Sequence, residues 1–164
     1  IDPDTGNKCI PWDLLPSFWV TENDYYDNKK WLKTPLMQSG NVEEKYKAVC
    51  GGIDEITKKH GYVRNGNIYK VESESRETVA LFCHFGVECV ILSHLLGISP
   101  VVLWHNFCAL PSSVTTLVTE EREQGKAAFR MCGFGDISHL YAGDEEPSFQ
   151  ARFCETYSNF EERH

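Results

Sequence analysis

The residue best placed for chemistry is His84, which follows an apolar run at 78–83 and precedes Phe85 and Gly86. The run predicts a strand buried on both faces, and the residues after it have helical spacing up to Gly97. A strand that leads into a helix presents backbone N–H groups and the positive end of a helix dipole. This junction therefore predicts an anion site, where a histidine binds phosphate or transfers a proton. The alternative is a structural histidine packed under the next loop, and position alone does not separate the two.

The reactive residues near His84 do not form another known catalytic motif. Cys83 is adjacent, but neighbouring side chains of a strand face opposite ways, so the pair is no Cys-His dyad. A cysteine-phosphatase loop would need Arg at position 89, where Cys89 stands. No phosphate-binding P-loop, serine-hydrolase elbow or zinc-protease helix motif occurs in the sequence.

The remaining histidines do not predict a metal centre. His94, His105 and His139 lack ligand spacing and an accompanying carboxylate cluster, so we expect no metal and no other cofactor. His94 lies on the apolar face of its expected helix and is interpreted as a core residue. The acidic run at 120–123 is interpreted as a solvated turn.

Composition narrows the class of protein. With 164 residues, 41% of them hydrophobic, and a net charge of −8, the chain is typical of a folded domain and a poor candidate for nucleic-acid binding. No uninterrupted apolar stretch reaches membrane-spanning length, so we expect no membrane contact. The seven cysteines are irregularly spaced and form no C-x-x-C, which favours reduced thiols and a cytoplasmic location.

The elements that must position His84 follow from periodicity and punctuation. We expect a helix at 41–60 with Asn41 as N-cap, then a hairpin over 62–71 around an Asn-Gly turn. Further along we expect a strand at 78–83, helices at 87–97 and 100–104, strands at 112–119 and 127–132 joined by a charged turn at 120–123, and a last helix at 148–157. This order predicts a layered α/β domain.

Residues 1–39 form a separate, aromatic-rich segment divided by prolines. We interpret it as one or two short helices that form a lid over a pocket, or as an excursion that only covers the core. As a lid, its candidate substrate contacts are Trp12, Trp19, Tyr25 and Trp31.

Three motifs in order resemble the histidine phosphatase superfamily, in its phosphoglycerate-mutase-like branch. They are 78–86 (TVALFCHFG), a helix ending in 95–98 (LLGI), and 110–115 (LPSSVT). The similarity runs from about Ser39 to Leu140 and implies that residues 40–164 are the C-terminal part of a three-layer α/β/α sandwich, with 1–39 as a cap insertion.

The resemblance also implies a mechanism. In that family a first histidine, in Arg-His-Gly, attacks the phosphoryl group, while two arginines and a second histidine bind the phosphate. His84 matches the second histidine, and Phe85 stands where the family usually has glycine, with its N–H still able to contact phosphate. No Arg-His-Gly occurs in this chain, so we expect the nucleophile to lie before Ile1 and the 164 residues alone to be inactive.

The resemblance thus implies a phosphomonoester phosphatase acting on a small phosphorylated substrate. The alternatives are a non-catalytic member that binds a phosphorylated ligand or a protein, and a mutase-type phosphotransferase. The resemblance further implies that the central strand of the family's sheet lies outside these residues, which would leave an edge for another segment or chain to fill. A homodimer or a domain swap is therefore a further expectation.

Overall fold

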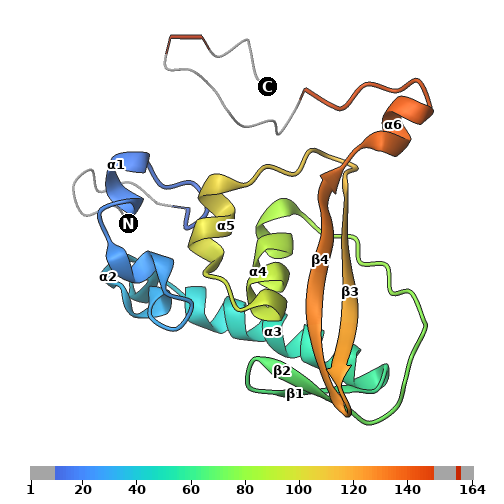
Figure 1. Cartoon of the computed structure of the whole chain (residues 1–164). Coiled ribbons are helices and arrows are strands. Elements are labelled where there is room, and N and C mark those ends of the chain that lie inside the picture. Colours follow the sequence, from blue (N-terminus) through green and yellow to red (C-terminus); the bar gives the residue numbers. More distant parts are fainter. Residues whose placement is uncertain (1–9, 150–157, 160–164) are drawn as a thin grey trace. The chain divides into compact units, whose positions relative to one another are not determined.

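The computed structural model describes residues 10–149 together with Ser158 and Asn159 (Figure 1). This part of the chain divides into two compact units. The first contains residues 10–107 and 119–129, and the second contains the remaining described residues. The two units share the long hairpin of β3 and β4, whose turn end belongs to the first unit and whose open end belongs to the second.

The first unit begins with short helices, as expected for the aromatic segment. They are α1 (Pro16–Trp19), η1 (Asn23–Tyr26), η2 (Trp31–Lys33) and α2 (Pro35–Gln38). Proline stands at the first turn of α1 and α2, where its missing N–H costs nothing. Three large side chains of this segment, Tyr25, Trp31 and Met37, are among the most deeply buried of the described residues.

The longest helix is α3 (Val42–Lys59), which confirms the helix expected at 41–60. Glu43 and Glu44 lie in its first turn and Lys58 and Lys59 in its last, the arrangement that the helix dipole favours. Its buried residues Cys50, Ile53 and Thr57 form one stripe, which packs against α4 and β1. Asn41 occupies the N-cap position, although its side chain makes no capping hydrogen bond.

Gly61 ends α3 and leads into the hairpin of β1 (Tyr62–Asn65) and β2 (Ile68–Val71). The strands pair antiparallel, with Asn65 opposite Ile68, and Gly66 has φ +65° in the turn. β2 also pairs antiparallel with β4 through Tyr69 and Ala127. The sheet therefore has four strands in the order β1-β2-β4-β3.

The prediction of a buried strand at 78–83 is wrong. These residues carry no strand assignment and form part of the long connection between β2 and α4 (Figure 1). Val79, Leu81 and Phe82 are exposed, Phe82 to 98%. The physical reason is that no strand within the described part of the chain pairs with this run, so nothing accepts its backbone hydrogen bonds or covers its side chains.

Two helices follow this connection, close to the expected bounds. α4 (Phe85–Leu96) ends at Gly97, which has the left-handed φ of +72°. α5 (Pro100–Asn106) begins at Ser99, whose hydroxyl accepts a hydrogen bond from the N–H of Val101. α4 packs on both α3 and α5, so it is the central helix of the first unit.

The two long strands extend beyond their expected limits, and the turn between them lies elsewhere. β3 (Val114–Glu123) and β4 (Lys126–Asp136) meet at residues 124–125, where Gly125 has φ +75°. Residues 120–123 thus belong to a strand, which corrects the predicted charged turn. Two of these acidic side chains contact residues at the turn. Glu121 accepts a hydrogen bond from the N–H of Gly125, and Glu123 forms an ion pair with Lys126.

The second unit contains the open end of this hairpin and α6 (Ser138–Ala142), a helix the sequence did not predict. Within it the N–H of Gly135 donates to the hydroxyl of Thr115 at 3.1 Å. Hydrogen bonds from Ser138 lower the pKa of Asp136 just before α6. The predicted last helix at 148–157 lies almost entirely outside the described residues.

Together, the helices and the antiparallel sheet make this a mixed α/β fold, as expected in outline. Across residues 10–149 and 158–159, no helix has both the length and the apolar character needed to cross a membrane.

Candidate functional site

His84 is the N-cap residue of α4, so a helix does follow it, but the strand expected before it is absent. Its backbone is extended, with φ −87° and ψ 155°, and its carbonyl accepts the N–H groups of Val87 and Glu88 at 3.0 Å each. The imidazole is exposed and makes no capping bond. An exposed imidazole therefore stands beside the first turn of a 12-residue helix, with Phe85 as its first residue. Such an arrangement can contribute to binding an anion.

An aromatic wall adjoins this turn. A Cβ placed on Gly86 would lie 3.7 Å from the ring of Trp12, so that ring covers Gly86. The indole of Trp104 donates to the carbonyl of Gly86 at 3.0 Å, and the Trp12 and Trp104 rings are 6.4 Å apart. Trp12 remains 48% exposed, whereas Trp104 is buried. Of the predicted lid residues, Trp12 is thus the one that the structure brings next to α4's first turn with an accessible ring.

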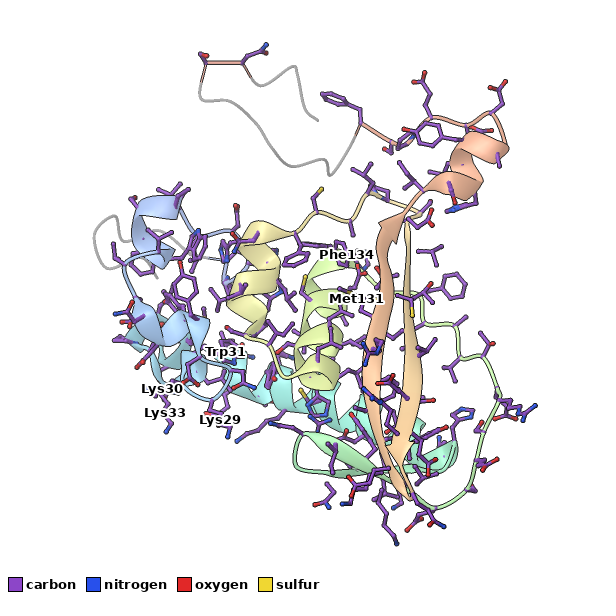
Figure 2. All side chains as sticks on the ribbon, in the orientation of Figure 1. Lys29, Lys30, Trp31, Lys33, Met131 and Phe134 are labelled. Atoms are coloured by element: carbon purple, nitrogen blue, oxygen red, sulfur yellow. The ribbon has the colours of Figure 1, made fainter. Side chains whose placement is uncertain are left out.

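The other predicted lid residues pack inside the first unit. Trp19 stacks on His105, and Trp31 contacts the rings of Tyr46 and Trp104 edge-on. Tyr25 is 2% exposed and Trp31 is 1% exposed. Figure 2 shows Trp31 turned inward, while Lys29, Lys30 and Lys33 lie on the outer side of the same segment. These three aromatic side chains form core, and their contact with a substrate stays a prediction.

The thiols next to the site are not activated. Cys83 is an exposed residue. The pKa of its thiol is nevertheless raised, mainly by the loss of part of its hydration and to a lesser extent by the charge of Glu88. Cys89 is fully buried, and the same two causes raise its pKa further. A nucleophilic cysteine needs a depressed pKa, so neither thiol suits that role.

A polar network that the sequence did not indicate holds α4 against α3 and the hairpin. His94 binds Asp54 of α3 at 2.8 Å, and its side chain is 13% exposed, so it lies at the border of the core. Arg64 of β1 donates to the carbonyl of His94 at 2.6 Å and to the hydroxyl of Tyr69. No local pattern could reveal this network, because His94 lies 30 residues after Arg64 and 40 residues after Asp54.

Among the residues that the structure describes, metal ligands do not gather around any of these histidines. Within the described ranges, no group of three or more His, Cys, Asp or Glu side chains could hold a metal ion. His139 lies exposed on α6 in the second unit.

His105 makes two hydrogen bonds that the sequence did not indicate. Its ring bonds the carbonyl of Val101 at 2.7 Å and the N–H of Leu14 at 3.0 Å. It thus joins α5 to the aromatic segment, a contact that only the tertiary structure reveals.

No family model, no curated protein and no solved structure matches the chain.

Proposed function

We propose that this chain supplies the second phosphate-binding histidine, His84, of a phosphomonoester phosphatase. The observation that carries the proposal is the position of His84 at the start of α4, within the motif order that resembles the histidine phosphatases. The proposal includes the family's three-layer sandwich, a cytoplasmic location and a small phosphorylated substrate.

The proposed reaction needs a nucleophile from outside these 164 residues, because the sequence contains no Arg-His-Gly. A histidine nitrogen attacks phosphorus, the P–O bond to the leaving group breaks, and that oxygen takes a proton from a carboxylic acid. Water then hydrolyses the phosphohistidine to release inorganic phosphate. His84, in its protonated form, would stabilise the negative charge on the phosphoryl oxygens, which is where such enzymes gain most of their rate.

The exposed apolar run at 78–83 supports this proposal. Apolar residues at Val79, Leu81 and Phe82 are costly to leave in water, at about 25 cal/mol for each Å². An added strand pairing parallel to this run would help to cover them and would bring its own carboxyl end to the neighbourhood of His84. A nucleophile carried at that end would then face the proposed phosphate site.

The proposal is tested with p-nitrophenyl phosphate. Hydrolysis is measured for the 164-residue chain and for the polypeptide of its complete reading frame. We expect turnover only from a polypeptide that contains Arg-His-Gly after an apolar strand. In that form His84→Ala should lower kcat/KM by about 10²–10³-fold, the range for loss of one oxyanion-stabilising group.

His139→Ala is the matched control, since His139 is also exposed but lies on α6. It should leave kcat/KM unchanged, and neither variant should move the unfolding midpoint. A complete reading frame without Arg-His-Gly, or full activity in His84→Ala, would overturn the proposed phosphatase.

A non-catalytic phosphate-binding role is the second candidate. It is favoured by Phe85, which replaces the usual glycine next to His84, and by the absence of the nucleophile motif. Titrating inorganic phosphate while following the His84 imidazole by NMR tests it. A saturable shift without turnover supports the binding role, and no shift assigns His84 a structural one. A mutase-type transfer would instead show phosphate exchange between two hydroxyl compounds.

A further inference from the structure

The two ring nitrogens of His105 have different hydrogen-bonding roles. Nδ1 lies 2.7 Å from the carbonyl oxygen of Val101, which can only accept, so Nδ1 carries the hydrogen. The N–H of Leu14 donates to Nε2 at 3.0 Å, so Nε2 carries the lone pair. Both bonds exist together only when His105 is neutral and has its hydrogen on Nδ1.

A proton on Nε2 would break this arrangement. It would remove the acceptor of the Leu14 N–H and place two N–H groups against each other, with Leu14 itself buried. The ring is also shielded, because Trp19 stacks on it with centroids 5.1 Å apart and an interplanar angle of 26°. Burial accordingly lowers the pKa of His105, while the Val101 carbonyl and the charge of Asp13 oppose this in part.

The other charged groups on elements packed against α5 do not offset this burial. On η1, Asp24 lies 3.7 Å from Lys30, and Glu22 accepts the N–H of Asp24 at the start of that helix. On α4, Glu88 lies in the first turn. Asp13 is therefore the one carboxylate among these whose charge contributes to the pKa of His105.

We propose that His105 is an acid-sensitive latch that fastens residues 10–19 to α5. Leu14 and Trp19 contact the latch directly, and Trp12, in the same short segment, covers Gly86 at the first turn of α4. Opening the latch would uncover the amino end of α4, where His84 lies. The latch stands independently of the proposed phosphatase.

The direction of the effect follows from proton linkage. The docked segment resists protonation of His105, whereas the released segment binds the proton with the ordinary histidine pKa of about 6.5. Docking is therefore complete above that pH and weakens as the pH falls below it. One linked proton lowers the docking equilibrium by up to about tenfold per pH unit, until the folded pKa is reached.

Amide hydrogen exchange tests the latch in the intact chain. Protection of peptides covering 11–19 is compared at pH 8 and pH 5.5, after correction for the pH dependence of intrinsic exchange. We expect severalfold lower protection at pH 5.5, with no change in peptides of α3. Equal protection of 11–19 at both pH values would overturn the proposal.

A variant and an NMR measurement complete the test. His105→Phe keeps a ring for Trp19 but cannot titrate. Residues 11–19 of this variant should be less protected than those of the wild type at pH 8, and their protection should be the same at pH 5.5 as at pH 8. His139→Phe is the control and should keep the wild-type pH dependence. In the wild type at pH 8, the ¹⁵N shifts of His105 must show the neutral form with hydrogen on Nδ1; hydrogen on Nε2 would contradict the latch even if His105→Phe fails to fold.

Discussion

At the scale of single residues, Gly61 has the tightest surroundings among the described glycines. It follows α3 with φ +89°, and a Cβ at this position would overlap the backbone carbonyl oxygen and the hydroxyl of Ser73. The left-handed conformation alone costs an L-residue about 1–2 kcal/mol, and the backbone overlap adds to it. Gly61→Ala should therefore lower the free energy of unfolding by roughly 3 kcal/mol.

Gly66→Ala provides the comparison for that prediction. Gly66 also has a positive φ, of +65°, but a Cβ there meets nothing within 4 Å. Gly66→Ala should lower the free energy of unfolding only by the cost of the left-handed conformation, about 1–2 kcal/mol. Urea unfolding of both variants measures the difference, and equal losses would mean that the contact with Ser73 relaxes freely.

Arg64 is the residue on which the hairpin and α4 depend most directly. Its guanidinium donates to the His94 carbonyl and to the hydroxyl of Tyr69, a fully buried side chain whose pKa burial raises to about 12. Arg64→Met should lower the free energy of unfolding by about 2–3 kcal/mol, because both acceptors lose a charged donor. Lys70→Met, at an exposed position of β2, should have little effect in the same urea titration. Similar losses in the two variants would show that the bonds made by Arg64 contribute little.

At the scale of elements, α3 contains a pair of glycines that it does not need for packing. Gly51 and Gly52 lie in mid-helix on the exposed side, and a Cβ on either would meet nothing within 4 Å. Each replacement by alanine should raise the free energy of unfolding by up to about 1 kcal/mol, since glycine loses more backbone entropy in a helix. The urea midpoint should rise while the slope of the transition stays the same.

Ala48→Gly is the reverse experiment on the same helix. Ala48 is exposed one turn before the glycine pair, so the change should destabilise by a similar amount. If the alanine variants at 51 and 52 destabilise the protein, the two glycines must serve a contact that lies outside the described residues.

The elements predicted correctly are those whose signals are local. To predict α3 it is enough to see charged residues in its first and last turns, an apolar stripe at helical spacing and a glycine at its end. The β1–β2 hairpin is predicted from its Asn-Gly turn alone. The run at 78–83 has an equally clear composition, yet a strand exists only when a neighbour pairs with it. The same limit applies at the site: His84 is found at its helix start from local signals, while the contact of Trp12 with Gly86 joins segments far apart in sequence.

At the scale of the whole molecule, the exposed run at 78–83 predicts self-association of the 164-residue chain. Phe82 is 98% exposed and Leu81 is 47% exposed, beside backbone groups that no described strand pairs. An exposed apolar segment with unpaired backbone groups favours contact with a strand or segment of another molecule. Light scattering should therefore show an apparent mass that rises with concentration.

Phe82→Lys should reduce that association and leave the urea midpoint nearly unchanged, because the side chain makes little contact within the chain. Tyr141→Lys, at a 64% exposed aromatic residue on α6, is the matched control and should associate like the wild type. Association that falls equally in both variants would point to general hydrophobicity and away from the run at 78–83.

The order of the strands also has a consequence for how the protein folds during synthesis. α3, β1 and β2 are consecutive and need only short-range contacts, so they can form as soon as they leave the ribosome. Tyr69 of β2, however, pairs with Ala127 of β4, and Phe129 packs on its ring, so both partners appear only after α4, α5 and β3 have been made. For that interval one edge of the nascent hairpin has no partner, and this is the stage at which a chaperone or a premature contact would have the most influence on the final fold.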